Sequence, residues 1–133
     1  MTGLDESAAQ DVVTFVGGLP GFETCRRFVL VAAPALDPFT CVHGVDQPAP
    51  SFLAIDPRKV VEGYECSIAP ADRARLEARP DQPLVWLALV TLGSDRATVN
   101  LRAPLVISPV TMRGVQVVAA DAHHALDHPL TGF

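Results

Sequence analysis

Short apolar stretches recur along the chain and are separated by prolines, glycines and aspartates. Segments of four to nine such residues, alternating or rich in β-branched side chains, predict strands. The run Leu84–Leu92 is apolar at nearly every position, which predicts a central strand buried on both faces. Ala97–Ile107 alternates strictly, with Val99, Leu101, Leu105 and Ile107 on one face, and Pro104 predicts a bend or an edge position within it. The other segments with strand-like patterns are Val12–Val16, Arg26–Ala32, Phe39–Val42, Phe52–Ile55, Glu62–Ile68 and Val115–Ala120.

One stretch has the pattern of a helix, Pro70–Ala78. Pro70 suits the first turn, and Asp72 near the start and Arg75 toward the end both complement the helix dipole. Many short strands with a single short helix favour a mostly β fold, a small antiparallel β-barrel or sandwich. We expect one β domain over residues 11–120, a flexible N-terminus at 1–10 and a loose C-terminal tail at 121–133.

The sharpest turn of the chain lies at residues 17–23, with the sequence GGLPGFE. Pro20 and Gly21 suit the two central positions of a type II turn. This places Leu19 and Phe22 on either side of one corner. Two interpretations remain open: these side chains plug one end of the barrel, or Phe22 and Glu23 are displayed to a partner.

Composition narrows the class of partner. Ten basic residues, of which Lys59 is the only lysine, and 15 acidic ones give a net charge of −5. Without a basic cluster the chain is poorly suited to nucleic acids, and its charge suits a basic protein partner. The three cysteines, with wide spacing and no Cys-x-x-Cys, predict neither a disulfide framework nor a zinc site. The sequence shows no signal peptide, and its longest apolar run is far shorter than the roughly 20 residues of a spanning helix. A soluble, cytoplasmic monomer is therefore expected.

Several motifs, taken together and in order, resemble the FliW family of bacterial flagellar assembly factors. The resemblance covers nearly the whole chain. Its most specific pieces are GLPGFE at 18–23, TVNLRAPLVI at 98–107 and RGVQVV at 113–118. The other matching pieces are RRFVL at 26–30, VDQP at 45–48, FLAIDP at 52–57, LVWLALVTL at 84–92 and His128-Pro129-Leu130.

The resemblance implies a small barrel-like domain that regulates without catalysis or a cofactor. Members of the family bind newly made flagellin and, in competition, the RNA-binding translational regulator CsrA, which relieves repression of flagellin translation. The chain departs from the usual family pattern at Gly44 and Ser108, where Ser and Asn are typical. It also lacks the Tyr and Arg that commonly precede the final His-Pro-Leu.

Candidate partner-binding residues combine exposed acids, aromatic anchors and one polar strand face. Aromatic side chains are frequent interface anchors, and acids suit a basic partner. Asn100 and Arg102 lie on the polar face beside Pro104, where a partner could add a strand, although Asn100 could equally bond a loop and Arg102 face solvent. The candidates are Phe22, Glu23, Glu62, Tyr64, Glu65, Asn100 and Arg102.

Catalytic and metal chemistry have weaker support in the sequence. His124 and His128 are four residues apart but lie in a segment with little to hold it helical, so no metal site is predicted. Cys41 and His43 could share a strand face, yet no third group would orient them, so no catalytic residue is predicted. The alternative function is a small ligand-binding or enzymatic barrel with a pocket near Cys41, His43 and Tyr64.

Overall fold

The computed structural model describes residues 12–19, 21–119 and 123–131, and the fold in this part of the chain is mostly β. The expected flexible N-terminus, Pro20 of the sharp turn and Ala120 lie outside the described residues. Among the described residues no helix is long and apolar enough to cross a bilayer. The elements, in chain order, are β1 (Val12–Phe15), β2 (Arg27–Val31), β3 (Phe39–Gly44), β4 (Ser51–Ile55), the 3-10 turn η1 (Pro57–Lys59), α2 (Pro70–Arg75), β5 (Val85–Leu92), β6 (Ala97–Val99), β7 (Leu105–Ser108), β8 (Arg113–Gln116) and β9 (His128–Pro129).

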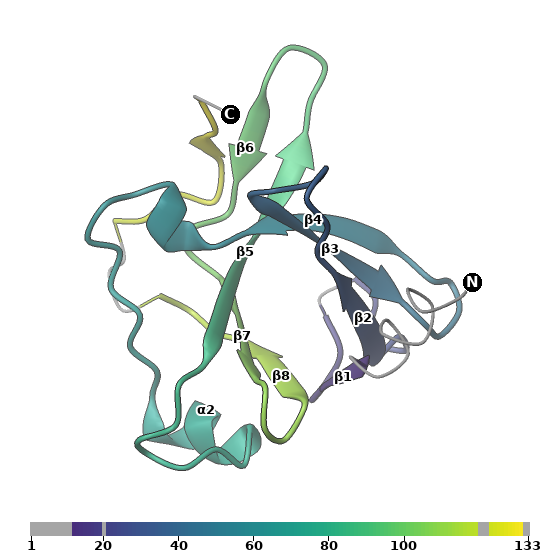
Figure 1. Cartoon of the computed structure of the whole chain (residues 1–133), viewed down its shortest axis with the longest axis vertical. Coiled ribbons are helices and arrows are strands. Elements are labelled where there is room, and N and C mark those ends of the chain that lie inside the picture. Colours follow the sequence, from purple (N-terminus) through teal and green to yellow (C-terminus); the bar gives the residue numbers. More distant parts are fainter. Residues whose placement is uncertain (1–11, 20, 120–122, 132–133) are drawn as a thin grey trace.

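Seven strands close into a barrel (Figure 1). They follow one another around the ring as β4, β3, β2, β1, β8, β7 and β5, and pairing of β5 with β4 completes the circle. Every pair is antiparallel except β1 with β8, which run parallel from Thr14 opposite Arg113 to Phe15 opposite Gly114. Of the two predicted architectures, the barrel is confirmed, and its closure removes most free strand edges.

The β5–β6 hairpin projects from the barrel, at the top of Figure 1. The first half of β5 pairs with β7 inside the barrel wall, whereas its last three residues pair with β6. The run Ala97–Ile107 is therefore two strands and not one. Asn100 breaks it, because its side-chain oxygen accepts hydrogen bonds from the backbone amides of Arg102 and Ala103, at 3.1 and 3.0 Å. The predicted bend near Pro104 is confirmed, and it begins at Asn100.

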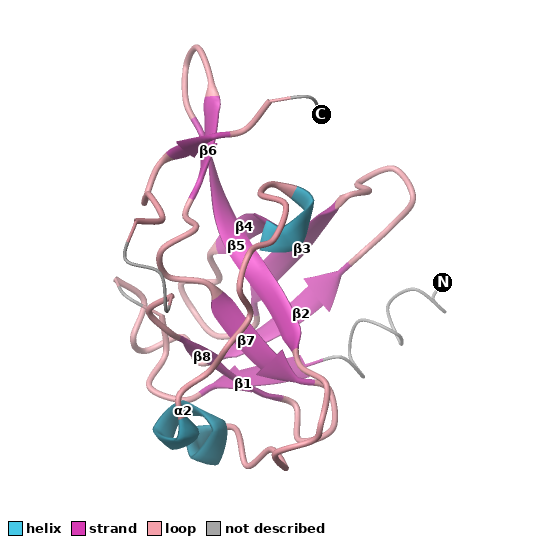
Figure 2. Ribbon diagram, turned by 90° about the vertical axis from the view of Figure 1, so that its left-hand side faces the viewer, coloured by secondary structure: helices cyan, strands magenta, loops and turns pink. Residues whose placement is uncertain are grey.

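The barrel wall is buried on two sides. An interior cluster fills the barrel and contains Phe15, Phe28, Val42, Leu87 and Ile107. An outer cluster lies on the other face of β5 and its neighbours, where the long connection from β4 to β5 and the end of the chain cover it (Figure 2). Trp86 and Leu87, adjacent in β5, belong to different clusters and are each 5% exposed. The prediction of a strand buried on both faces is therefore confirmed for the middle of β5, whereas Leu92 at its end is 71% exposed.

The alternating pattern predicted the wrong arrangement for two segments, residues 97–107 and 62–68. Val99 and Leu101 lie in the outer cluster, but Leu105 and Ile107 lie in the interior cluster, because the turn at Asn100 moves the chain from one layer to the other. The expected alternation at 62–68 is not a strand. This segment crosses the outer cluster without pairing to a strand, and its alternation reflects burial on one side only.

Two ends also differ from expectation. Helix α2 ends at Arg75, before the predicted Ala78, and Glu77 adopts a left-handed φ of 54° that a continuing helix does not allow. Within the expected C-terminal tail, His128 and Pro129 form β9, which pairs with β6. The described part of the tail therefore lies against the sheet.

Candidate partner-binding surface

The side chain of Tyr64 links the segment between β4 and β5 to the start of the turn at Asn100. Its ring is 5% exposed, and its hydroxyl donates a 2.7 Å hydrogen bond to the backbone oxygen of Leu101. Burial raises the pKa of Tyr64 to about 12, so the phenol is neutral at physiological pH. The other side of the ring stacks on His124 with 4.6 Å between ring centroids. Tyr64 is therefore an anchor of the fold, and it brings the predicted residues Asn100 and Arg102 beside it.

Exposed charges surround this anchor. Glu62 and Glu65 are exposed on either side of Tyr64 in sequence. Arg102 is exposed as well, and its Nε donates a 2.9 Å hydrogen bond to the backbone oxygen of His124. We call the area formed by Glu62, Tyr64, Glu65, Arg102 and His124 the Tyr64 surface. The sequence pattern marks His124 only as a possible metal ligand, and its stacking on Tyr64 was not predicted, because nothing local indicates which ring this histidine meets.

Phe22 and Glu23 belong to a different part of the molecule. Leu19 is 2% exposed in the interior cluster, while Phe22 is half-buried against the ring of Phe52, 5.5 Å away between centroids. Glu23 is exposed and accepts a 3.1 Å hydrogen bond from the amide of Gly21. Leu19 therefore plugs one end of the barrel, whereas Phe22 remains partly accessible. The seven sequence candidates form two separate groups.

The alternative pocket does not assemble. Cys41 and His43 lie on either side of Val42 in β3, and Val42 points into the interior cluster, so both face outward. Tyr64 is buried in the outer cluster.

A different cleft, of about 490 Å³, is present in the structure, but Cys41, His43 and Tyr64 do not line it. Its lining includes Arg58, Cys66, Arg73 and Trp86, a combination that strand and loop patterns did not predict. Among the described residues no group of three metal-ligating side chains is present.

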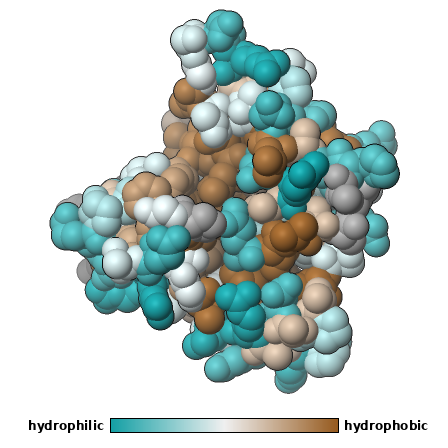
Figure 3. All heavy atoms as spheres, turned by 180° about the vertical axis from the view of Figure 1, so that it is seen from behind, coloured by the Kyte–Doolittle hydropathy of each residue, from teal (hydrophilic) through white to brown (hydrophobic). Residues whose placement is uncertain are grey.

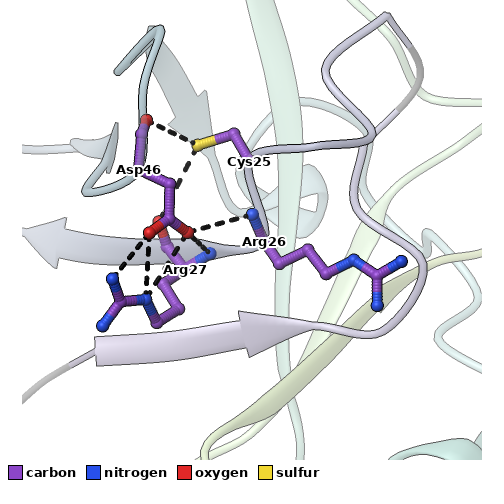
Figure 4. A network of polar contacts seen from close by, with 4 residues as sticks. All are labelled: Cys25, Arg26, Arg27 and Asp46. Atoms are coloured by element: carbon purple, nitrogen blue, oxygen red, sulfur yellow. Dashed lines mark hydrogen bonds and ion pairs between the residues drawn. The ribbon is translucent and has the colours of Figure 1, made fainter.

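A compact polar network joins β2 to the loop after β3 (Figure 4). Asp46 accepts hydrogen bonds from the guanidinium of Arg27, at 2.6 and 3.1 Å, and from the backbone amides of Arg26 and Arg27. The buried thiol of Cys25 donates to the backbone oxygen of Asp46 at 3.2 Å. Hydrogen bonds from the Arg27 side chain and backbone hold the pKa of Asp46 below its usual value. The network therefore fixes the chain entering β2 and leaving β3.

The lowered pKa of Asp46 predicts that the stability of the folded protein depends on pH. A carboxyl whose folded pKa is lowered stabilises the folded state above its unfolded pKa, near 4, and loses that contribution as pH falls through the folded pKa. We expect the melting temperature of the wild type to exceed that of Asp46→Asn most at neutral pH, with the gap closing below about pH 4. Thermal unfolding of both proteins across pH 2.5 to 7, roughly the range in which carboxyls titrate, measures the gap. A gap independent of pH would contradict the ionic role of Asp46.

Comparison with known proteins identifies the family of this chain. The family model described as FliW protein matches residues 1–130. The chain belongs to the FliW family. The flagellar assembly factor FliW of Syntrophotalea carbinolica is 34% identical over 122 residues, covering 91% of this chain and 87% of that protein. The FliW of Natranaerobius thermophilus is 33% identical, covering 90% of this chain and 81% of its own length. A crystal structure of a flagellar assembly factor FliW superposes with a TM-score of 0.83 at 29% identity, covering 92% of this chain and 87% of the solved one.

The motifs that carry the FliW resemblance mostly build the barrel. Arg27 of RRFVL and Asp46 of VDQP are ion-paired to each other, and Asp56 of FLAIDP caps η1 through the amide of Arg58. Gly44, where this chain departs from the usual pattern, is buried in β3, and a Cβ there would lie 2.8 Å from Cys25 Sγ and from Pro50 Cδ. Glycine at position 44 therefore leaves room for the thiol of Cys25, whereas a serine there would require Cys25 or Pro50 to move.

Proposed function

We propose that this chain is a non-enzymatic cytoplasmic regulator that binds flagellin and, in competition, CsrA, and so relieves repression of flagellin translation. The observation that carries the proposal is the FliW match over residues 1–130, together with a barrel that superposes on a FliW crystal structure along 92% of the chain. No catalytic step is needed. When flagellin is exported, the freed protein becomes available to capture CsrA by mass action.

Charge and surface character support a protein partner. The net charge of −5 suits a basic regulator, and Glu62 and Glu65 put two exposed acids on the Tyr64 surface. Apolar side chains are also exposed on the face opposite to that of Figure 1, where they gather between polar projections (Figure 3). Exposed apolar area between polar groups is typical of protein interfaces.

The seven candidate residues take different roles in this proposal. Glu23, Glu62, Glu65 and Arg102 are exposed and would contact a partner directly. Phe22 would contribute its partly exposed side chain. The remaining two act as positioning residues, since Tyr64 is buried and the side-chain oxygen of Asn100 is used by its own turn.

A titration against flagellin and CsrA from the same cell, followed by competition between them, tests the proposal. Binding to both with mutual displacement is expected. Binding to flagellin alone would reduce the protein to a flagellin chaperone and direct attention to Gly44 and the altered tail. Binding to neither would overturn the proposal.

Charge reversal on the Tyr64 surface gives a sharper result. The variant Glu62→Lys/Glu65→Lys should bind CsrA about tenfold or more weakly at low salt, because two attractive charges become repulsive. Isothermal titration calorimetry at two salt concentrations measures this, and the loss should shrink at high salt. The control is Asp95→Lys at the β5–β6 hairpin tip, a single charge reversal on an exposed loop that should leave affinity nearly unchanged. Equal effects in both variants would show that the Tyr64 surface does not contact CsrA.

A further inference from the structure

The projecting strand β6 has one edge covered by a very short segment of the chain. One edge of β6 pairs with β5, from Val90 opposite Val99 to Leu92 opposite Ala97. The other edge pairs with β9, which contributes only His128 and Pro129. One further hydrogen bond continues this pairing, from the amide of Leu130 to the backbone oxygen of Ala97 at 3.0 Å. The edge is thus covered without a long strand of its own sheet.

Backbone atoms of this segment make several of the hydrogen bonds that hold it against the sheet. We call residues 123–130 the strap. The backbone oxygen of Ala125 accepts a 3.0 Å hydrogen bond from the amide of Leu101, and that of His124 accepts from Arg102 Nε at 2.9 Å. Any extended peptide has the same carbonyl oxygens. Two strap side chains also have specific contacts: Leu130 packs on the outer cluster and His124 stacks on Tyr64.

Pro129 makes β9 the end of the sheet. Backbone N–H groups alternate in direction along a strand, and the amide of Leu130 points to β6. The nitrogen of Pro129 therefore points away from β6, where it has no hydrogen to offer. A further strand would find a missing donor on β9, so the edge that can accept a strand is that of β6, beneath the strap.

We propose that the β6 edge is the docking site for an extended segment of the protein partner, and that the strap is a tethered stand-in which the partner displaces. The incoming segment pairs antiparallel with Ala97 and Val99 through its backbone. It places a leucine-class side chain on the outer cluster in place of Leu130 and a planar ring over Tyr64 in place of His124. Strand addition of this kind draws affinity from main-chain hydrogen bonds and specificity from alternate side-chain positions. The proposal rests on the proposed function in taking flagellin as the partner.

Displacement makes the two occupants compete. A tethered strap is present at a high effective concentration, so it lowers the apparent affinity of the partner in proportion to the fraction of time that the edge is covered. Weakening the strap should therefore strengthen partner binding, although it weakens the fold. A strap with a purely structural role would give the opposite or no change in binding.

A reversible lock tests the proposal directly. Thr98 and Pro129 are opposite each other in a pair without mutual hydrogen bonds, the kind with Cα atoms about 4.5 Å apart, within the range that a disulfide spans. The oxidised variant Thr98→Cys/Pro129→Cys should bind flagellin at least about tenfold more weakly than the same protein after reduction. Thr98→Cys alone is the control for thiol chemistry, since the chain already has three free cysteines, and it should show no such difference. Equal affinity of the oxidised and reduced forms would overturn the docking site while leaving flagellin binding established. Flagellin binding to neither form would instead overturn the proposed function.

A second measurement tests, in the absence of flagellin, whether the β6 edge binds an extended peptide. A fluorescent peptide with the sequence of residues 124–131 should bind Leu130→Ala at least about tenfold more tightly than the oxidised locked protein. The same Leu130→Ala variant should melt at a lower temperature yet bind flagellin more tightly than the wild type. The matched control is Leu126→Ala, because Leu126 lies in the strap but is 57% exposed. Equal peptide binding by the unlocked and locked proteins would overturn the proposal.

Discussion

Replacing Phe28 with alanine is expected to lower the free energy of unfolding by about 3–5 kcal/mol, the largest effect of any single change considered for this barrel. Phe28 is fully buried at the centre of the interior cluster. Its ring meets that of Phe15 edge to face at 5.5 Å between centroids, and it lies 6.3 Å from that of Phe52. Alanine would remove these contacts and leave a cavity that closed barrel strands cannot readily fill.

Equilibrium urea denaturation measures this loss from the shift in midpoint. Val118→Ala is the matched control, because Val118 is 77% exposed and its truncation should change stability by about 0.5 kcal/mol or less. If Phe28→Ala cost no more than the control, the interior of the barrel would not be packed as described. Where the variant remains folded at low temperature, its flagellin and CsrA affinities should match the wild type, because Phe28 has no exposed surface.

Replacing Gly114 with alanine is expected to cost about 1–3 kcal/mol through overpacking. A Cβ at 114 would lie 2.7 to 3.0 Å from three atoms of the Phe15 ring. That ring is fully buried, and Gly114 is directly opposite Phe15 where β1 and β8 pair in parallel to close the barrel. Neither the ring nor the strand can retreat without disturbing this closure.

A double-mutant cycle tests the cause. Phe15→Leu removes the ring that a Cβ at 114 would meet, so Gly114→Ala should cost clearly less in the Phe15→Leu background than in the wild type. Denaturant unfolding of the four proteins gives the interaction energy. Additive effects would show that the strain at Gly114 arises elsewhere, for example in the backbone of β8.

Local pattern was sufficient to locate most strands and their buried faces. In β2, the alternation that sets Phe28 and Leu30 apart from Arg27 and Val29 predicts the face that fills the barrel. The continuous apolar character of Leu84–Leu92 predicts burial on both faces, which holds for the middle of β5. These inferences succeed because side chains alternate across any extended segment, whatever its neighbours are.

The same pattern failed where long-range contacts decided the outcome. The segment 62–68 alternates like a strand but pairs with none, since alternation reports one-sided burial and not a hydrogen-bonded partner. The run from Ala97 to Ile107 looks uniform, yet Asn100 ends β6 and moves the chain between layers. The role of Asn100 is open from the sequence alone, and in the structure its side chain bonds its own turn.

The sequence alone therefore predicts local features: the extended segments, the apolar face of each, and the acidic charge. It also carries a family resemblance, which depends on the order of motifs along the whole chain. Other features became known only from the folded protein: β1 and β8 close the barrel in parallel, Arg27 pairs with Asp46, and Tyr64 stacks on His124. Each of these joins residues far apart in the chain. Such pairings depend on how the whole barrel closes, and a period of two along one strand carries no information about its neighbour.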